Sequence, residues 1–508
     1  MADETDGGIL TLATQGSITF VGNILGKALS FIFIAVATRL VSPSEYGIFT
    51  LGLSIVLFVQ GFASLNIYRS VDFFIPQFLI NSEYGKAKKT LQNAFVIGVS
   101  TSVIGAIILF FSKDRLATLF NEPAIAAVLP LFLLLIPLQT VFRLLMVSFN
   151  SIKKMKYRVA VKNIFNPLVR TLGAIVLVSI GARVMGLIGG YLIGITLAIL
   201  SGFAFLFYEV DWLRDTKAAP ISTRSLVSYS LPLMFAGVIY SIVGQIDYFV
   251  IGYFLGSASV GQYRVAYLLS ANLLIVLSAM TPIFKPMVAE SKSDTARLER
   301  HYQLATRWVT MFTLPIAIML ILAPEVYLSI LFTEQYAVAG AAVVALTFGY
   351  LFNASFGPEG MILEGLGRTR LTLFNTIVLV SVNGLLDVFL VPQFGILGAA
   401  IATGTALTVA GFAGVLEIYI LRSVIPFSSS LARIWLAGIP AAGCGLFLVS
   451  LSLKDIYIFP LLPTLIAVIY LVGLRLVGGF TQVEQDIAAQ IDTRIGMTLM
   501  TRLVPRDD

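Results

Sequence analysis

The residues of this chain that could do chemistry are charged side chains inside long apolar runs. The cations within or at the ends of these runs are Lys27, Arg39, Arg69, Arg143, Lys162, Arg170, Arg264, Lys285 and Arg307. The acids are Asp72, Asp247, Asp387 and Glu417. A charge near the centre of a membrane span costs about 3 kcal/mol on insertion scales, so such residues usually face a wet cavity or a partner. The excess of cations favours an anionic ligand, because Arg and Lys bind phosphate oxygens strongly in a low dielectric.

Depth within the runs separates these candidates. The charged residues nearest the middle are Lys27, Arg143, Arg170 and Asp247, and we predict that they line a substrate-binding cavity. Buried pairing of the cations with Asp247 or Asp72 is the alternative. A secondary set comprises Arg69, Asp72, Arg264 and Lys285. Arg69 and Asp72 are three residues apart, so an ion pair on one helix explains them equally well.

The other charges lie close to the ends of their runs. Arg307, Lys162 and Glu417 are near one end, and Arg39 and Asp387 are near the other. Long side chains at such positions usually extend to the membrane surface, so we expect snorkelling rather than function here.

Nothing in the sequence indicates an enzyme. There is no nucleotide-binding P-loop, and no catalytic motif stands out, so we predict no catalytic residues. Cys444 lies in an apolar run and His301 lies in a charged loop, so neither a metal site nor a cofactor is predicted. The loops expected outside the membrane are too short to hold an acceptor substrate. The net charge of +7 reflects Lys and Arg in loops on one side of a membrane, and we predict no nucleic-acid partner.

The elements that must position these charges are membrane-spanning helices. The chain is 58% hydrophobic and 12% charged, about half the charge of a soluble domain. Apolar runs of about 20 residues recur, and each is long enough to cross a bilayer. We predict an all-α membrane protein with fourteen spans at 16–41, 47–80, 90–112, 124–149, 159–180, 184–208, 227–255, 259–289, 303–323, 337–363, 371–391, 396–421, 432–453 and 456–478.

Lys and Arg are distributed unequally between alternate loops. One side holds most of them, whereas the loops of the other side hold only Lys113, Arg115, Arg183 and Lys454. The basic side is expected to be cytoplasmic, so both termini are predicted to lie in the cytoplasm. An even number of spans satisfies this orientation.

The opening hairpin repeats later in the chain. The turn that ends at Gly47 corresponds to the turn that ends at Gly261, and six spans follow the same order in each copy. We predict two parallel six-helix lobes, between which substrate would bind. The predicted parts are a cytoplasmic N-terminal tail 1–15, disordered at residues 1–8, an N-lobe 16–208, a cytoplasmic linker 209–226, a C-lobe 227–421, two extra spans within 432–478 and a cytoplasmic amphipathic tail 479–508.

Two stretches carry a resemblance to a known family. The first runs from Lys27 through Ser42-Pro43-Ser44-Glu45-Tyr46-Gly47 to Phe49. The second comprises Ser230-Leu231-Pro232-Leu233-Met234, Asp247 and Gly261-Gln262-Tyr263. The chain resembles, over residues 10–505, the polysaccharide exporters and O-antigen-type flippases of the multidrug/oligosaccharidyl-lipid/polysaccharide exporter superfamily.

The resemblance implies two six-helix lobes around a central cavity and transport of an isoprenoid-diphosphate-linked oligosaccharide to the outer leaflet of the plasma membrane. Its cationic cavity residues would be Lys27, Arg143 and Arg170, matched by depth rather than by motif. The isoprenoid tail is expected to stay in membrane lipid, beside the last two spans. Partners in such a pathway would include a glycan polymerase or glycosyltransferases.

Two other functions remain open from the sequence. A cation-coupled multidrug exporter would have the same fold, but its drug-exporting relatives often carry an acid in the first span, and none lies between Gly16 and Val41. A membrane glycan polymerase or ligase is the other alternative. It would need an outward-facing acid or arginine cluster, and the outer loops offer little of this kind.

Overall fold

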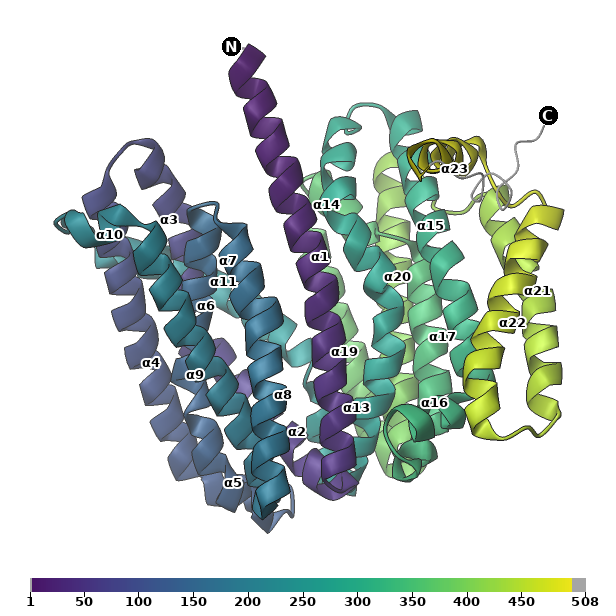
Figure 1. Cartoon of the computed structure of the whole chain (residues 1–508), viewed down its shortest axis with the longest axis horizontal. Coiled ribbons are helices and arrows are strands. Elements are labelled where there is room, and N and C mark those ends of the chain that lie inside the picture. Colours follow the sequence, from purple (N-terminus) through teal and green to yellow (C-terminus); the bar gives the residue numbers. More distant parts are fainter. Residues whose placement is uncertain (1, 496–508) are drawn as a thin grey trace. The chain divides into compact units, whose positions relative to one another are not determined.

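The structure, a computed structural model, describes residues 2–495, which form helices and turns without a strand among them (Figure 1). The all-α prediction is therefore confirmed. The chain divides into two compact units, residues 1–264 and 265–508. The first unit includes residues 227–264, which the sequence analysis assigned to the C-lobe, so the six-plus-six lobe boundary stays a prediction.

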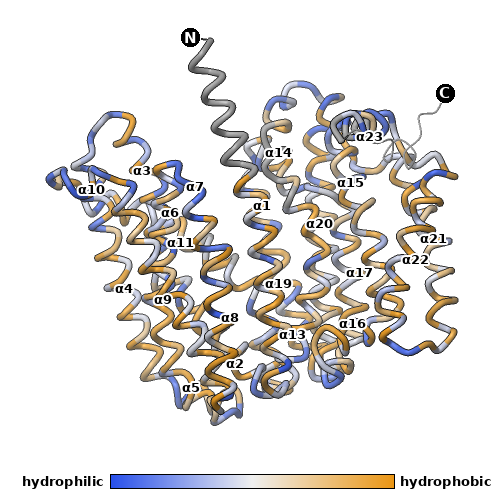
Figure 2. The backbone as a smooth tube through the Cα atoms, viewed as in Figure 1, coloured by the Kyte–Doolittle hydropathy of each residue, from blue (hydrophilic) through white to orange (hydrophobic). Residues whose placement is uncertain are grey.

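Thirteen helical segments of the described chain are long and apolar enough to cross a membrane. Figure 2 shows apolar residues along most helices and polar residues at many turns. The longest segment, residues 155–209, contains a break at Gly181 (φ +93°) and Arg183 (φ +43°). The helices on either side of this break pack against each other, as the close approach of Gly173 to Gly190 shows. Dividing this segment would give fourteen spans, and that count stays a prediction.

The first unit contains the helices of the N-terminal half of the chain. Its helices are α1 (Ala2–Leu40), α2 (Pro43–Ala63), α3 (Tyr68–Ile80), α4 (Tyr84–Leu119), α5 (Pro123–Leu133), α6 (Leu135–Ser151), α7 (Met155–Val159), η1 (Ala160–Phe165), α8 (Asn166–Leu177), η2 (Val178–Ala182), α9 (Arg183–Glu209), α10 (Asp211–Asp215), α11 (Thr223–Val243), α12 (Ile246–Leu255) and the first part of α13 (Ser257–Ala271). Helix α1 begins at Ala2, where the sequence analysis expected a disordered tail.

Several predicted spans are divided in the structure, among them 47–80 and 227–255. The run 47–80 divides into α2 and α3 at Leu65 (φ +47°) and Asn66 (φ +50°). Asn tolerates this left-handed conformation, and the Asn66 side-chain amide donates to the Leu233 carbonyl oxygen of α11 at 2.8 Å. The run 227–255 divides into α11 and α12 between Val243 and Ile246. The hydropathy pattern does not indicate either break, because the residues around both breaks remain largely apolar.

A capping box fixes the start of α2. The Ser42 hydroxyl accepts the backbone N–H of Glu45 at 3.3 Å, and the Glu45 carboxylate accepts the backbone N–H of Ser42 at 3.0 Å. Pro43 occupies the first helical turn, where its missing N–H costs nothing. This geometry turns the chain sharply from α1 into α2.

The two turns that correspond in the sequence repeat contact each other within the first unit. A Cβ atom on Gly47 would overlap the carbonyl oxygen of Ser257, and one on Gly261 would overlap that of Pro43. The hydroxyls of Ser44 and Ser257 are 3.0 Å apart. The N-terminal turns of α2 and α13 therefore meet backbone to backbone, which requires glycine at both positions.

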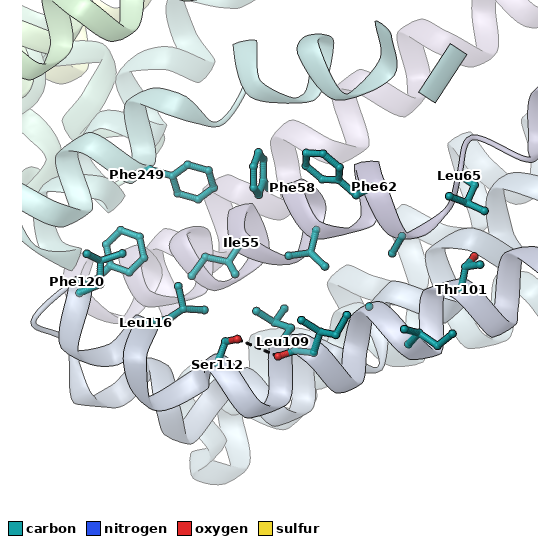
Figure 3. A pocket seen from close by; sticks show the side chains of 16 residues that line it. Ile55, Phe58, Phe62, Leu65, Thr101, Leu109, Ser112, Leu116, Phe120 and Phe249 are labelled. Carbon is teal, nitrogen blue, oxygen red and sulfur yellow. Dashed lines mark hydrogen bonds between the residues drawn. The ribbon is translucent and has the colours of Figure 1, made fainter. Parts of the chain in front are cut away.

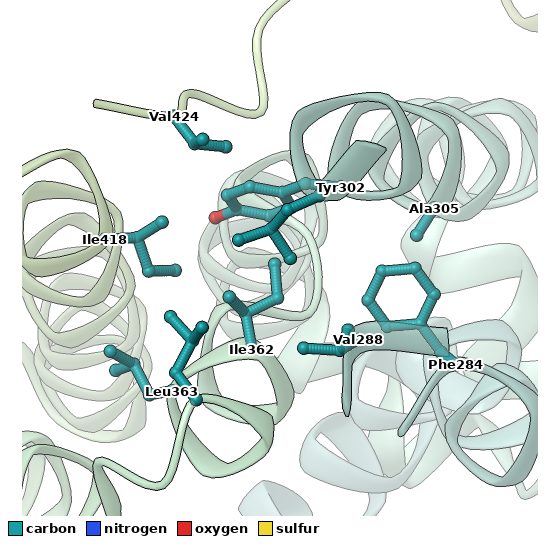
Figure 4. Packing of buried hydrophobic residues seen from close by; sticks show 10 residues of the cluster. Phe284, Val288, Tyr302, Ala305, Ile362, Leu363, Ile418 and Val424 are labelled. Atoms are coloured by element: carbon teal, nitrogen blue, oxygen red, sulfur yellow. The ribbon is translucent and has the colours of Figure 1, made fainter. Parts of the chain in front are cut away.

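The second unit continues with η3 (Asn272–Leu274), α14 (Ile275–Glu290), α15 (Thr295–Leu322), α16 (Pro324–Leu331), η4 (Glu334–Ala339), α17 (Gly340–Phe356), α18 (Glu359–Gly365), α19 (Thr369–Phe394), α20 (Ile396–Arg422), α21 (Ser429–Ser450), α22 (Asp455–Leu476) and α23 (Gln482–Ile495). Buried apolar side chains of α14, α15, α18 and α20 form a core cluster around Tyr302 (Figure 4). The Tyr302 hydroxyl donates to the Phe356 carbonyl oxygen at 2.8 Å, which satisfies its polar end.

Arg307 of α15 holds helix α23 in place, and the snorkelling expected for it is wrong. Its side chain is 2% exposed and forms an ion pair of 2.8 Å with Glu484. The guanidinium also donates to the Thr481 hydroxyl at 2.9 Å and to the Gly479 carbonyl oxygen. The indole N–H of Trp308 donates to Glu484 at 2.6 Å. The Glu484 carboxylate also accepts the backbone N–H of Thr481 at 2.8 Å, which caps the start of α23, and it accepts the Thr481 hydroxyl as well.

Candidate functional site

A polar pocket lies inside the first unit, among α1, α2, α8, α9, α12 and α13. Its volume is about 220 Å³. The side chains that line it include Arg170, Arg264, Tyr46, Tyr191, Tyr248 and Gln245. No Asp or Glu is among its lining residues. Two cations and several aromatic rings without a carboxylate form a setting that favours an anion.

Arg170 enters the pocket from α8. Its guanidinium carbon lies 4.2 Å from the ring centre of Phe33 and 4.8 Å from that of Tyr191, so both rings contribute cation–π contacts. Gly194 lets α9 lie close to α8 at Arg170, because a Cβ atom on Gly194 would be only 2.8 Å from the Cβ of Arg170. The Arg170 Nε is buried without a hydrogen-bond partner in the described structure. Aromatic contacts thus orient the guanidinium while part of its donor capacity stays unused.

Arg264 reaches the same pocket from α13. Its Nη1 donates to the Tyr248 hydroxyl at 2.8 Å, and its guanidinium carbon lies 5.6 Å from the Tyr248 ring centre. Tyr46 is buried and lines the pocket together with both arginines. The structure therefore brings together one cation of the main predicted set and one of the secondary set.

Asp247 is placed differently from these arginines. Its side chain is 5% exposed, and its Oδ2 accepts the Tyr263 hydroxyl at 2.5 Å. Asp247 is not among the residues that line the pocket, although its neighbour Tyr248 is. The carboxylate thus fixes α12 against α13 and so helps to position the tyrosine that holds Arg264.

A second group of cations lies on α6, α7 and η1. The positive charges of Arg143 and Arg158 act on Lys162. The charge of Asp72, an exposed residue of α3, acts on Arg158. Arg143 is half-buried and its guanidinium lies 6.0 Å from the Tyr68 ring centre. Arg143 therefore belongs to a basic cluster that the sequence analysis did not assemble, and the pocket-lining residues do not include it.

Three further predicted residues are distributed elsewhere. Lys27 is exposed on α1 and does not line the pocket. Arg69 is exposed, and its guanidinium carbon lies 5.4 Å from the Tyr68 ring centre. No ion pair within 4.0 Å joins Arg69 to Asp72 in the described structure. The local ion pair offered as an explanation for these two residues is therefore wrong. The side chain of Lys285 lies outside the described residues.

Asp387 is the other charge whose position contradicts the snorkelling expectation. It is fully buried between α19 and α20, and its Oδ2 accepts the side-chain amide of Asn383 at 3.3 Å. The same amide lies 3.3 Å from the Thr403 hydroxyl. A buried polar cluster therefore stands where the sequence analysis expected a residue reaching toward the membrane surface. No group of three His, Cys, Asp or Glu suited to a metal was found in the described part of the chain.

Sequence reasoning missed the aromatic residues that orient the two arginines. Phe33, Tyr191 and Tyr248 resemble any of the other aromatics, which make up 12% of the chain. One signal was available for Tyr248, since it directly follows the predicted site residue Asp247. Phe33 and Tyr191 had no comparable signal, because their approach to Arg170 depends on how α1 and α9 pack around α8.

Comparison with known sequences identifies relatives over most of the chain. It is 23% identical over 406 residues to the probable low-salt glycan biosynthesis flippase Agl15 of Haloferax volcanii, covering 79% of this chain and 82% of the relative. It is 24% identical over 349 residues to the succinoglycan biosynthesis transport protein ExoT of Rhizobium meliloti, covering 67% of this chain and 66% of the relative.

Comparison with solved structures identifies the fold. The lipid II flippase MurJ in an inward closed conformation superposes with a TM-score of 0.69 at 14% identity, covering 90% of this chain and 98% of that chain. A multidrug resistance MATE family transporter of the MOP superfamily, in an inward-facing conformation, gives a TM-score of 0.66 at 14% identity, covering 78% of this chain and 94% of that chain. The chain thus shares the fold of these two transporters. Together with the thirteen apolar helical segments of the described residues, this makes it a multi-pass membrane protein.

The family itself follows from a match to a family model. Residues 36–341, more than half of the chain, match the model described as polysaccharide biosynthesis protein. This range contains the α1–α2 turn, both arginines of the pocket and the glycines that join the two turns. The resemblance to polysaccharide exporters is thereby confirmed, and the chain belongs to the polysaccharide biosynthesis protein family.

Proposed function

We propose that this protein moves an isoprenoid-diphosphate-linked oligosaccharide from the cytoplasmic to the outer leaflet of the plasma membrane. The observation that carries the proposal is the pair Arg170 and Arg264 in one pocket without a lining carboxylate. A diphosphate offers several oxygens to such a pair, and charge-assisted hydrogen bonds are the strong ones in a protein. The relatives named as a glycan biosynthesis flippase and as a succinoglycan biosynthesis transport protein support the same substrate class.

The basic cluster and the pocket suggest an order of events under this proposal. Arg143, Arg158 and Lys162 lie toward the end of the first unit that the loop charges assign to the cytoplasm. They would attract the diphosphate first, and Arg170 with Arg264 would hold it deeper in the membrane. The glycan would then travel in water between two lobes that expose the site to each side alternately. Both termini would lie in the cytoplasm.

The contact of Gly47 with Gly261 supplies the outer seal in this mechanism. The two turns meet backbone to backbone, so the seal is tight only while both positions lack a side chain. Opening to the outside requires these turns to separate. Release of the diphosphate would follow, since water entering the pocket weakens its attraction to the arginines. A glycan polymerase or glycosyltransferases would use the lipid-linked product.

A cation-coupled drug exporter is disfavoured by the same pocket. Arg170 and Arg264 would repel a cationic drug, and no lining carboxylate is there to attract one. The MATE transporter shares the fold with this chain at 14% identity, which does not extend to its substrate. We therefore retain the lipid-linked glycan as the substrate class.

The leaflet position of lipid-linked glycan tests the proposal. Cells that lack this protein are expected to accumulate intact glycan-lipid on the cytoplasmic leaflet and to lose surface glycan. The parent chain should restore export, and Arg170→Gln combined with Arg264→Gln should not. Arg115→Gln is the matched control, because it removes an exposed Arg of α4 outside the pocket. Normal outward delivery without the protein would contradict the proposal.

A further inference from the structure

A second cavity of the first unit is an apolar groove between α2 and α4 (Figure 3). Its volume is about 710 Å³. Aromatic side chains line one wall, and aliphatic side chains of α4 line the other. Its two hydroxyl groups on α4 are satisfied locally, because Thr101 donates to the Ile97 carbonyl oxygen at 2.9 Å and Ser112 to that of Ile108 at 3.0 Å. The groove therefore offers almost nothing to a polar ligand.

Helix α2 separates this groove from the arginine pocket. Ser54 and Leu57 line the pocket, whereas the adjacent residues Ile55 and Phe58 line the groove. An α-helix with its side chains is about 10 Å across, so the two cavities lie close together. The first unit thus places a cationic site and an apolar site on opposite faces of one helix.

Helix α12 has the same division. Tyr248 lines the pocket, and the next residue, Phe249, lines the groove. Phe249 contacts Phe58 of α2 with ring centres 5.7 Å apart, and it contacts Phe120 at 6.4 Å. Aromatic side chains therefore form the groove side of the seam between α2 and α12, and they can rotate without breaking a hydrogen bond.

We propose that the groove binds the polyprenyl tail of the substrate while Arg170 and Arg264 hold its diphosphate. This inference rests on the proposed function and gives the tail a place different from the last two spans. An amphiphile with an anionic head and an apolar chain matches the two cavities in both charge and polarity. The chain would pass the α2–α12 seam beside Phe58 and Phe249.

The covalent link between the tail and the bound diphosphate explains why this tail would displace ordinary lipid from the groove. Acyl chains of the bilayer are as apolar as the groove, so transfer from lipid gives little hydrophobic gain, and only packing discriminates. Once the arginines hold the diphosphate, however, its own tail is confined near the groove at a high effective concentration. A lipid whose head does not bind the arginines lacks this advantage.

Photo-crosslinking measures which chain occupies the groove. Ile108 and Ile107 are both exposed on α4, at 63% and 51%, but only Ile108 lines the groove. Each would be replaced by p-benzoylphenylalanine in the full chain, in proteoliposomes with radiolabelled undecaprenyl diphosphate. We expect about tenfold more labelling at position 108 than at position 107, as the tethered chain predicts. Unlabelled undecaprenyl diphosphate should compete, whereas excess dioleoyl phosphatidylglycerol should not.

The outcomes separate this inference from the proposed function. Equal labelling at positions 108 and 107, in a protein that still exports glycan-lipid, would overturn the groove assignment and leave the function intact. Strong labelling at position 108 that persists with Arg170→Gln and Arg264→Gln would support the groove but contradict the arginines as the head site. Competition by phosphatidylglycerol would assign the groove to bulk lipid and overturn the inference.

A blocking substitution provides an independent measurement. Ile108→Trp would fill part of the groove, and Ile107→Trp is its matched control on the same helix. Transport of a fluorescent undecaprenyl-diphosphate disaccharide should fall several-fold in Ile108→Trp relative to this control, because a long chain needs the groove. Transport of the farnesyl analogue should fall much less. An equal loss for both chain lengths would contradict a tail site.

Discussion

Two arginines of this protein, Arg170 and Arg307, both lie on membrane-spanning helices but have opposite surroundings. Arg307 is 2% exposed, and its charge is matched by Glu484 with further acceptors around it. Arg170 is oriented by the rings of Phe33 and Tyr191, in a pocket without a lining carboxylate. An arginine whose donors are satisfied by the protein maintains structure, whereas one oriented only by stacking keeps donors available for a ligand.

The largest expected effect follows from breaking the buried pair. Glu484→Ala would leave the Arg307 charge buried without its partner, a change that costs about 3–5 kcal/mol. Undocking of α23 should then increase by more than about a hundredfold. Hydrogen exchange of the α23 amides would measure it. Gln490→Ala, at an exposed position of the same helix, is the control and should leave exchange unchanged. Unaltered exchange in Glu484→Ala would show that Arg307 does not anchor the helix.

The next effect concerns the seal over the arginine pocket. Gly47→Ala would force the two turns apart at a cost of about 1–3 kcal/mol, because the new methyl group meets the Ser257 backbone. A cysteine at Ser54, a buried pocket position, should then react faster with a membrane-impermeant maleimide. The background would be Cys444→Ala, which removes the one native cysteine.

The Arg307 region supplies the control for this opening. A cysteine at Thr310, buried three residues after Arg307, should react equally slowly with Gly or Ala at position 47. Faster reaction at both positions would indicate general unfolding rather than opening of the seal. An unchanged rate at position 54 would contradict the role of the Gly47–Gly261 contact.

The sequence predicted the fold class, the family and two of the cations that line the candidate site, for identifiable physical reasons. Burying charge in lipid is so costly that Arg170 and Arg264 were conspicuous in the sequence alone. Depth along a helix could not, however, distinguish them from Arg307 or Asp387, since partners from distant segments decide each case. Glu484 lies 177 residues beyond Arg307. The breaks in α2–α3 and α11–α12 were hidden for a related reason, because the apolar pattern continues through them.

Arg170→Gln should separate binding from stability. Losing its cation–π contacts costs about 1 kcal/mol of folding free energy, so the thermal unfolding temperature should change little. Losing a charged hydrogen bond to a diphosphate costs about 2 kcal/mol, which is about a 30-fold loss of affinity for undecaprenyl diphosphate. Arg307→Gln should show the reverse pattern. A large loss of stability with unchanged binding in Arg170→Gln would remove the distinction between the two arginines.

The smallest effect is a dependence of the Arg307 anchor on pH. Burial opposes ionisation of Glu484, but the Thr481 hydrogen bonds, the Arg307 charge and the Trp308 indole outweigh it and lower the pKa of Glu484 below its ordinary value of 4.5. Because the folded pKa is the lower one, the stabilisation is complete above pH 4.5. It is lost as the pH falls through the folded pKa, where the docked carboxylate becomes protonated.

Trp308 can report this transition, because its indole donates to Glu484. In a chain with Trp212→Phe and Trp435→Phe, the remaining emission should shift to longer wavelength below pH 4.5 as α23 undocks. Glu484→Gln keeps the shape of the side chain without its titration, so its emission should not change over the same range. The same shift in both chains would assign the transition to another group. If only the emission of the parent chain shifts, the Glu484 carboxylate is what distinguishes Arg307 from Arg170.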